Sequence, residues 1–168
     1  FPTNVTPWQR AAQTFGLEVV FLNAADFASD DGLVALEREL ERGLRLVAVS
    51  AVQFQTGMRM PIEAMARRCH AAGAQIFVDG IQAVGAVPVD VRAWDVDYLG
   101  CGSHKWLMGL EGAGFLYVRP ERAPELVPRV AGWLSHEEPL RFLVEGEGYL
   151  RYDQPIRNEP SFLESGAI

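Results

Sequence analysis

The chain has 168 residues, of which 49% are hydrophobic and 22% charged, a composition typical of a globular domain with a sizeable core. A formal net charge of −7 argues against nucleic-acid binding, which requires clustered cations against phosphates. No apolar stretch approaches the roughly 20 residues that a membrane helix needs. We therefore expect a soluble, cytoplasmic protein that contacts neither nucleic acid nor membrane.

Helical and strand patterns alternate along the first part of the chain. Apolar spacing predicts a helix over residues 6–15, and a β-rich run predicts a strand over residues 18–23. A stripe of leucines predicts a second helix that begins at Asp30 and ends before Gly43. The apolar run 46–52 then predicts a strand buried on both faces, as in parallel sheets.

The alternation continues with one helix and three strands. Pro61 begins the helix, Gly73 ends it, and the strands are predicted over residues 75–78, 96–101 and 114–118. This order of elements predicts an α/β fold, with a mostly parallel sheet and helices on both of its faces. From residue 119 onward, prolines interrupt a stretch without a clear period, which we expect to be irregular.

The cysteines and histidines show no spacing typical of metal ligands, so we predict no metal site. Cys69 falls on a predicted helix and Cys101 at a strand end, and we expect both to be buried thiols. We expect His70, on the same helix as Cys69, to be a surface or half-buried residue. His136 lies in the irregular stretch.

Polar side chains follow three of the predicted strands. They are Gln53, Asp79 and the cluster Ser103, His104 and Lys105. Ligands of open α/β sheets bind beyond the carboxyl ends of the strands, so we expect these side chains to meet in one crevice.

Lys105 is the only lysine among fifteen basic residues. Arginine keeps its proton at ordinary pH, whereas a lysine amine can lose it and condense with an aldehyde to form a Schiff base. The alternative is a lysine that persists by chance in an arginine-rich chain.

Asp79 and Gln82 are close enough in sequence to contact one planar ligand from the same short turn. A pyridinium nitrogen needs a carboxylate and a phenolate oxygen needs a hydrogen-bond donor. The alternative is that Asp79 only caps the turn. Trp106 is expected to fill the core rather than line the site, and the glycines between residues 109 and 114 fit no nucleotide-binding loop.

Three motifs in this order resemble those of the class V aminotransferase family of pyridoxal 5′-phosphate (PLP) enzymes. The matching stretches are residues 49–57 (VSAVQFQTG), 77–85 (FVDGIQAVG) and 103–118, which begins SHKWLMG and ends GFLYV. The resemblance implies the PLP-dependent transferase fold of type I, with this chain as the central part of its large domain.

The resemblance also implies roles for the residues of the turn and for the lysine. Lys105 would bind PLP as a Schiff base and would move the α-proton of the substrate. Asp79 would pair with the protonated pyridine nitrogen, which keeps the ring able to withdraw electrons. Gln82 would donate a hydrogen bond to the ring oxygen beside the imine.

The phosphate of PLP would be held by His104 and Ser103, although relatives often place the serine one position earlier, where this chain has Gly102. Gln53 matches a position near the face of the cofactor. A plain hydrogen-bonding partner at a strand end is an equal alternative for Gln53.

The likeness covers residues 1–118 and, more faintly, residues 161–167. Residues 1–118 would form the cofactor-binding α/β core, and residues 119–168 an irregular segment leading toward a C-terminal small domain outside this chain. Ala167 stands where relatives often have a hydroxyl residue that reaches the cofactor phosphate of the neighbouring subunit. We still expect a homodimer with active sites at its interface.

The function that the resemblance implies is that of a PLP-dependent enzyme acting on amino-acid and keto-acid substrates, with transamination as the leading reaction. A cysteine desulfurase or another PLP lyase is the first alternative. A truncated, non-catalytic α/β fragment is the second. No residue of the chain identifies the substrate.

Overall fold

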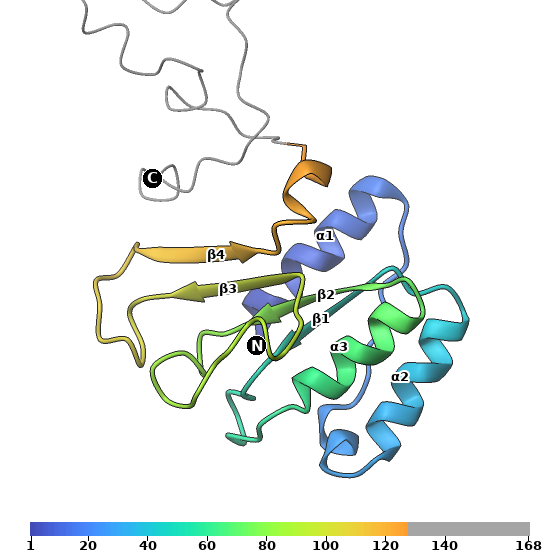
Figure 1. Cartoon of the computed structure of the whole chain (residues 1–168), viewed down its shortest axis with the longest axis horizontal. Coiled ribbons are helices and arrows are strands. Elements are labelled where there is room, and N and C mark those ends of the chain that lie inside the picture. The colour runs from blue at the N-terminus through green and yellow to red at the C-terminus, as the bar shows by residue number, and fades with distance from the viewer. Residues whose placement is uncertain (128–168) are drawn as a thin grey trace, which may run out of the picture. The chain divides into compact units, whose positions relative to one another are not determined.

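The computed structural model describes residues 1–127, in which helices and strands alternate along the chain (Figure 1). The elements in chain order, with 3-10 helices marked η, are η1 (Pro2–Asn4), α1 (Thr6–Phe15), η2 (Ala24–Ala28), α2 (Asp31–Glu41), β1 (Leu46–Ser50), α3 (Ile62–Ala71), β2 (Gln75–Asp79), β3 (Tyr98–Gly102), β4 (Gly114–Val118) and η3 (Ala123–Glu125). The three predicted helices and four of the five predicted strands are present. His136 and the motif at 161–167 lie outside the described residues.

The four strands form one sheet in the order β1-β2-β3-β4. β1 pairs with β2, and β2 with β3, in parallel. β4 is drawn running opposite to β3 (Figure 1). The predicted α/β fold with a mostly parallel sheet is therefore confirmed.

Helices cover both faces of this sheet. Along β2 the side chains alternate, so that Ile76 and Val78 face the core formed with α2 and α3 while Phe77 faces the other way. On that other face the Trp8 ring of α1 contacts Phe77 edge to face, with 5.2 Å between the ring centroids. The two helices of the core and the single helix opposite enclose β2 from both sides.

The core takes its apolar side chains from the positions that helical spacing predicts. The buried residues of this kind are Leu33, Leu36 and Leu40 in α2 and Ile62, Met65, Ala66 and Cys69 in α3. Each large side chain that is fully buried contributes about 1.5–3 kcal/mol to folding. Packing of these faces, rather than helix propensity, therefore holds both helices on the sheet.

The strand predicted over residues 18–23 is absent, and this prediction is wrong. The segment instead connects α1 to η2 without regular secondary structure. Its apolar side chains Val20 and Phe21 are exposed. A β-rich sequence forms a strand only where it pairs with a neighbouring strand and buries a face, and residues 18–23 pair with none of the four strands of the sheet.

By contacts between its residues the chain divides into two units, Phe1–Tyr117 and Val118–Ile168. The described part of the second unit includes η3, and Arg122, which directly precedes this helix, forms an ion pair of 3.1 Å with Glu125. The predicted division at residue 118 stays a prediction. Among residues 1–127 no helix has the length and apolar character needed to cross a membrane.

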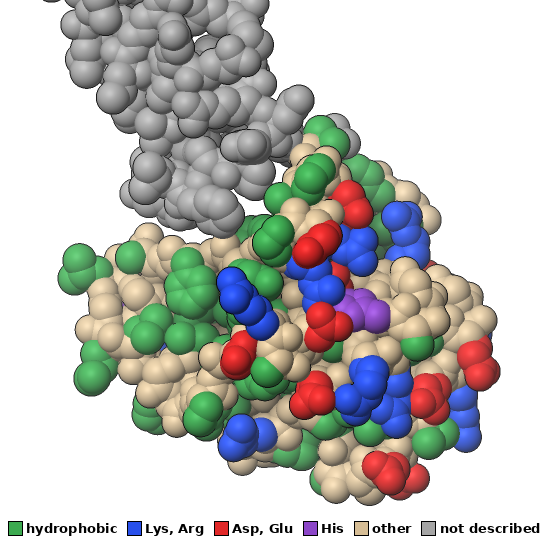
Figure 2. Space-filling view, viewed as in Figure 1, with side chains coloured by type: hydrophobic (Ala, Val, Ile, Leu, Met, Phe, Trp, Pro, Cys, Tyr) green, Lys and Arg blue, Asp and Glu red, His purple; other side chains and the backbone are tan. Residues whose placement is uncertain are grey.

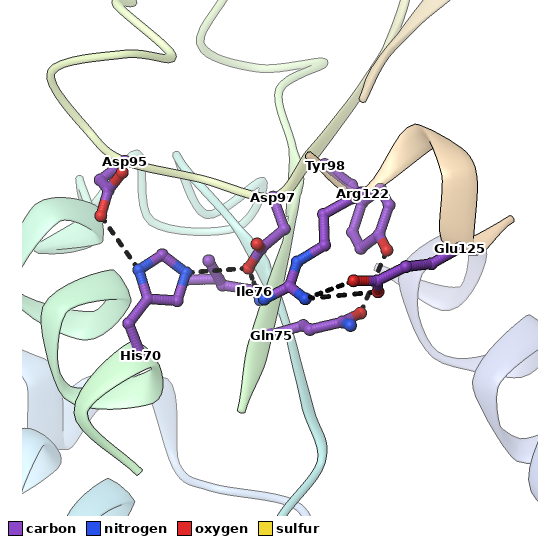
Figure 3. Close-up of polar contacts among 8 residues, drawn as sticks. All are labelled: His70, Gln75, Ile76, Asp95, Asp97, Tyr98, Arg122 and Glu125. Atoms are coloured by element: carbon purple, nitrogen blue, oxygen red, sulfur yellow. Dashed lines mark hydrogen bonds and ion pairs between the residues drawn. The ribbon is translucent and has the colours of Figure 1, made fainter. Parts of the chain in front are cut away.

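A buried carboxylate stabilises the edge of the sheet at which β2 and β3 begin (Figure 3). Asp97 is fully buried and accepts a hydrogen bond of 2.8 Å from the backbone nitrogen of Ile76. His70 of α3 lies between two carboxylates, with Nε2 3.0 Å from Asp97 and Nδ1 3.0 Å from Asp95. His70 is half-buried, as expected, but the sequence did not predict that it joins α3 to the segment directly before β3.

We expect Asp97→Ala to lower the free energy of unfolding by about 3 kcal/mol, because the buried amide of Ile76 loses its acceptor and His70 loses its buried partner. Chemical denaturation followed by circular dichroism measures this loss. Asp95→Asn is the control, because it neutralises the exposed partner of the same ring while keeping a residue type that tolerates the positive φ of 56° at this position. The control should cost under about 1 kcal/mol, and equal losses in both variants would contradict a special role for the buried carboxylate.

Candidate functional site

The parallel register brings the carboxyl ends of β1, β2 and β3 to one edge of the sheet. Ser50 pairs in register with Asp79, and Asp79 pairs with Gly100. Asp79 is therefore the last residue of the central strand, beside the last residue of β1. Lys105 follows shortly after the end of β3.

Both oxygens of the Asp79 carboxylate accept hydrogen bonds from the protein. Oδ2 accepts from the Ser50 hydroxyl at 3.0 Å, and Oδ1 accepts from the backbone nitrogen of Ile81 at 3.0 Å. The second bond is the turn cap that was the alternative for this residue. The first bond is not part of a cap, and together the two give the half-buried carboxylate a defined orientation at the strand end.

Gln82 and Trp106 connect the turn after β2 with the loop after β3. The indole nitrogen of Trp106 donates a hydrogen bond of 2.9 Å to Oε1 of Gln82. An indole N–H can only donate, so the amide nitrogen of Gln82 points away from the ring and keeps its own two protons for another acceptor. Trp106 is 55% exposed, and the prediction that it fills the core is wrong.

The amine of Lys105 lies among aromatic rings. Its Nζ is 5.5 Å from the centroid of the Phe1 ring and 5.9 Å from that of Phe54. These two rings contact each other edge to face, with centroids 5.2 Å apart. Within residues 1–127 no carboxylate lies within ion-pair distance of Lys105. The half-buried amine therefore forms no ion pair with these residues, and its nitrogen is available to react with an aldehyde.

The loop that carries Lys105 is closed by short contacts. The Ser103 hydroxyl donates to the carbonyl of Leu110 at 2.6 Å, and the backbone nitrogen of Gly109 donates to the Ser103 carbonyl at 2.8 Å. A Cβ atom at Gly109 would lie 2.8 Å from the Ser103 Cβ, so only glycine fits there. Met108 adopts a φ of 52°, which is uncommon for a residue with a side chain.

The remaining predicted site residues surround this loop and the end of β1. His104 is exposed, and its ring lies so near Gly102 that a Cβ atom there would come within 3.0 Å of it. The glycine at this position therefore makes room for the histidine. Gln53 donates a hydrogen bond of 3.2 Å from its amide nitrogen to the carbonyl of Ser50.

Charges at this edge act on the thiol of Cys101. Burial raises its pKa, the negative charge of Asp79 raises it further, and the positive charge of Lys105 opposes them. Cys69 lies on α3, where burial and the charge of Asp97 raise its thiol pKa to about 12. Both cysteines are free and buried, as expected. Since the thiolate is the reactive form, neither cysteine is a suitable nucleophile at neutral pH.

A hollow of about 610 Å³ lies next to the two aromatic rings, and its walls include Phe1, Val5, Gln53 and Phe54. In residues 1–127 no group of three or more His, Cys, Asp and Glu side chains is arranged to hold a metal ion. The reactive groups at this edge are therefore the amine of Lys105, the carboxylate of Asp79 and the amide of Gln82. The Phe1 and Phe54 rings lie beside the amine.

Exposed apolar side chains gather near the Lys105 loop. Figure 2 shows hydrophobic side chains over the end of the sheet where β3 and β4 are joined, whereas charged side chains dominate over α2 and α3. The large apolar side chains that this loop exposes are Trp106, Leu107, Met108 and Leu110, and Met108 is 91% exposed. A contiguous exposed apolar patch often marks a site of interaction with another molecule.

The chain matches the family model "Aminotransferase class-V" over residues 1–136. It is 37% identical over 112 residues to the uncharacterized aminotransferase YcbU of Bacillus subtilis, a match covering 65% of this chain and 30% of that protein. It is 38% identical over 156 residues to a cysteine desulfurase of Dickeya dadantii, covering 93% of this chain and 36% of that protein.

The chain is also similar to solved structures of PLP enzymes and cysteine desulfurases. The apo structure of cysteine desulfurase from Thermococcus onnurineus NA1 is 30% identical, with a TM-score of 0.75 over 98% of this chain and 39% of its own. A mutant of C-DES with glycine covalently linked to its PLP cofactor is 29% identical, with a TM-score of 0.74 over 81% of this chain and 37% of its own.

The chain thus spans between 30% and 39% of the length of these proteins. The family model covers most of the chain and includes β1 to β4 with the Asp79 turn and the Lys105 loop. The likeness to solved structures extends to the whole arrangement of sheet and helices. The chain therefore belongs to the class V aminotransferase family, with the fold of type I.

Proposed function

We propose that the protein is a PLP-dependent enzyme that acts on amino acids through Lys105. The observation that carries this proposal is the amine of Lys105, which has no carboxylate partner among residues 1–127 and lies next to aromatic rings. The adjacent residue, Trp106, is hydrogen-bonded to Gln82 in the turn that follows Asp79. An amine is the one group of this edge that can condense with the aldehyde of PLP.

The residues at this edge fit the chemistry of PLP. Asp79 offers an oriented carboxylate for a protonated ring nitrogen, and Gln82 offers free amide protons for a ring oxygen. The rings of Phe1 and Phe54 beside the Lys105 amine offer apolar faces for a planar ring. When bound, PLP withdraws electrons from the α-carbon of an amino acid and so stabilises negative charge there.

Each residue would then have its own part in the proposed reaction. Lys105 would hold the aldehyde carbon of PLP and would also move the proton of the substrate α-carbon. Asp79 would keep the ring nitrogen protonated, and Gln82 would donate a hydrogen bond to the ring oxygen. His104 and Ser103 hold the phosphate, for which the Ser103 hydroxyl would exchange its present bond to Leu110.

Gln53 is the least distinctive member of the proposed site. Its wall position in the hollow supports a contact with the cofactor face, while its bond to the Ser50 carbonyl supports a purely structural role. Replacing Gln53 is therefore the least informative test of the site.

Two reactions are candidates, and both use the same α-carbon chemistry. Relatives that cover most of this chain are named cysteine desulfurases, which favours cleavage of a C–S bond. The relative YcbU, named as an aminotransferase, favours transamination with a keto acid. The chain has two cysteines, Cys69 and Cys101, and their burial and raised pKa values argue against either of them as the sulfur acceptor of a desulfurase.

Product analysis of the full chain supplied with PLP separates the two reactions. Alanine from cysteine, with sulfide released when a thiol reductant is added, would support a desulfurase. A new keto acid from an amino-acid donor would support an aminotransferase. Neither product, on a chain that binds PLP at Lys105, would contradict both reactions.

We also propose that the protein is a cytoplasmic homodimer. The exposed apolar loop at Trp106, Leu107, Met108 and Leu110 supports burial against a second copy. Residues 1–118 would form the cofactor-binding core, and residues 119–168 would lead toward a small domain. The boundary between the two units at Tyr117 and Val118 supports this division.

Lys105→Ala should abolish the adduct that PLP and borohydride form with the wild-type chain, because no other lysine exists in these 168 residues. Intact mass spectrometry counts the adduct, and peptide mapping locates it. Lys105→Arg is the matched control for charge, since its guanidinium stays protonated and forms no stable imine. The terminal α-amino group can also form an adduct, so the mapped position decides: a wild-type adduct that maps only to the terminal amine would contradict the role of Lys105, and a wild-type chain without any adduct would support a non-catalytic fragment.

Trp106→Phe should weaken PLP binding by about two- to tenfold, because Gln82 loses the hydrogen bond that orients its amide. The thermal midpoint should change little, since the side chain is largely exposed. Titration with PLP gives the dissociation constant. Gln82→Ala and the double variant complete a mutant cycle, in which the losses should not add if the two residues act as a pair. Fully additive losses would show that Trp106 does not act through Gln82.

A further inference from the structure

A continuous series of hydrogen bonds leads from the N-terminal helix to Asp79. The indole nitrogen of Trp8 donates to Oδ1 of Asn4 at 3.0 Å, and Nδ2 of Asn4 donates to the Ser50 hydroxyl at 3.3 Å. The Ser50 hydroxyl donates to Oδ2 of Asp79 at 3.0 Å. Four side chains from α1, η1, β1 and β2 are thus linked in a row.

The direction of every bond in this series is fixed by its two ends. The indole N–H of Trp8 can only donate, so Asn4 must turn its oxygen toward Trp8 and its amide nitrogen toward Ser50. An ionised carboxylate can only accept, so the Ser50 proton must point to Asp79. All donors therefore point toward the negative charge, and each bond polarises the next.

The four side chains are held in place independently of any ligand. Parallel pairing sets Ser50 directly beside Asp79. The ring of Trp8 is fixed by its edge contact with Phe77 of the same strand as Asp79. Trp8, Asn4, Ser50 and Asp79 are all half-buried, so water competes only in part for these bonds.

We propose that Ser50 is a positioning residue for Asp79, and that Asn4 and Trp8 hold the Ser50 hydroxyl for this task. This inference rests on the proposed function, in which Asp79 pairs with the ring nitrogen of PLP. The Ser50 hydroxyl fixes one carboxylate oxygen while the Ile81 amide fixes the other. The carboxylate then meets the ring nitrogen without having to reorient, which is where preorganised charge is most effective.

The test compares two cofactors that differ at one atom. PLP has a ring nitrogen, whereas 1-deazapyridoxal 5′-phosphate has a carbon in its place and offers nothing for Asp79 to pair with. Ser50→Ala should weaken binding of PLP about tenfold, as for loss of a hydrogen bond to a charged group. It should change binding of the deaza compound by less than about twofold, because that affinity does not depend on Asp79. Fluorescence titration of the full chain, freed of cofactor, gives both dissociation constants.

Three further variants sharpen the comparison. Ser50→Thr keeps the hydroxyl and should bind PLP like the wild type. Trp8→Phe keeps the ring contact but loses the N–H, and it should give a smaller loss, about two- to threefold, again for PLP alone. Ser29→Ala is the matched control, because Ser29 also donates to a carboxylate, Asp31, at 3.0 Å but lies at the start of α2, away from the site. It should change neither affinity.

The outcomes distinguish this inference from the proposed function. Equal losses for both cofactors in Ser50→Ala, or no loss for either, would overturn the positioning role while leaving the proposed function intact. A wild-type chain that binds the two cofactors equally would show that Asp79 does not pair with the ring nitrogen and would overturn both. Should Ser50→Ala fail to fold, Ser50→Cys, whose S–H is a weak donor, gives the same selective loss if the inference holds.

Discussion

The parallel pairing of β1, β2 and β3 is the constraint on which the rest of the structure depends. It ends three strands at one edge and sets Ser50 beside Asp79. Side chains along a strand alternate between faces, so a slip of β1 by one residue would remove Ser50 from Asp79 and turn the buried valines Val47 and Val49 outward. The apolar core therefore enforces the register, and the register in turn aligns the polar groups at the edge.

The two ends of β2 and β3 use carboxylates in opposite ways. Asp97, directly before β3, is fully buried, and the contacts of its Oδ2 with His70 and Ile76 join helix to sheet. Asp79 at the end of β2 is half-buried and remains near the open edge. The same side chain thus stabilises the fold at one end and, in the proposed function, binds a ligand at the other. Burial decides which, because a carboxylate sealed from solvent and ligand can only be structural.

Periodicity predicted the fold well, since the apolar stripes of α2 and α3 and the short runs of β1 and β2 report burial directly. It failed for residues 18–23, because β propensity does not reveal whether a partner strand exists. The candidate residues Asp79 and Lys105 were predictable from their places after strands. The bonds of Trp106 to Gln82 and of His70 to Asp97 were not, because each joins residues more than twenty positions apart and follows no local pattern.

The turn after β2 and the loop after β3 touch at two separate points. One is the bond between Gln82 and Trp106, and the other is the backbone of Trp106 against Gly85, where a Cβ atom would come within 2.7 Å. Gly85 has a φ of 90°, and its lack of a side chain lets the Trp106 backbone approach closely. Both contacts fall on Trp106, so the loop meets the turn through its side chain and its backbone at once. A displacement of the turn that carries Gln82 would therefore press on the residue next to Lys105, and a side chain at position 85 would push the same residue away.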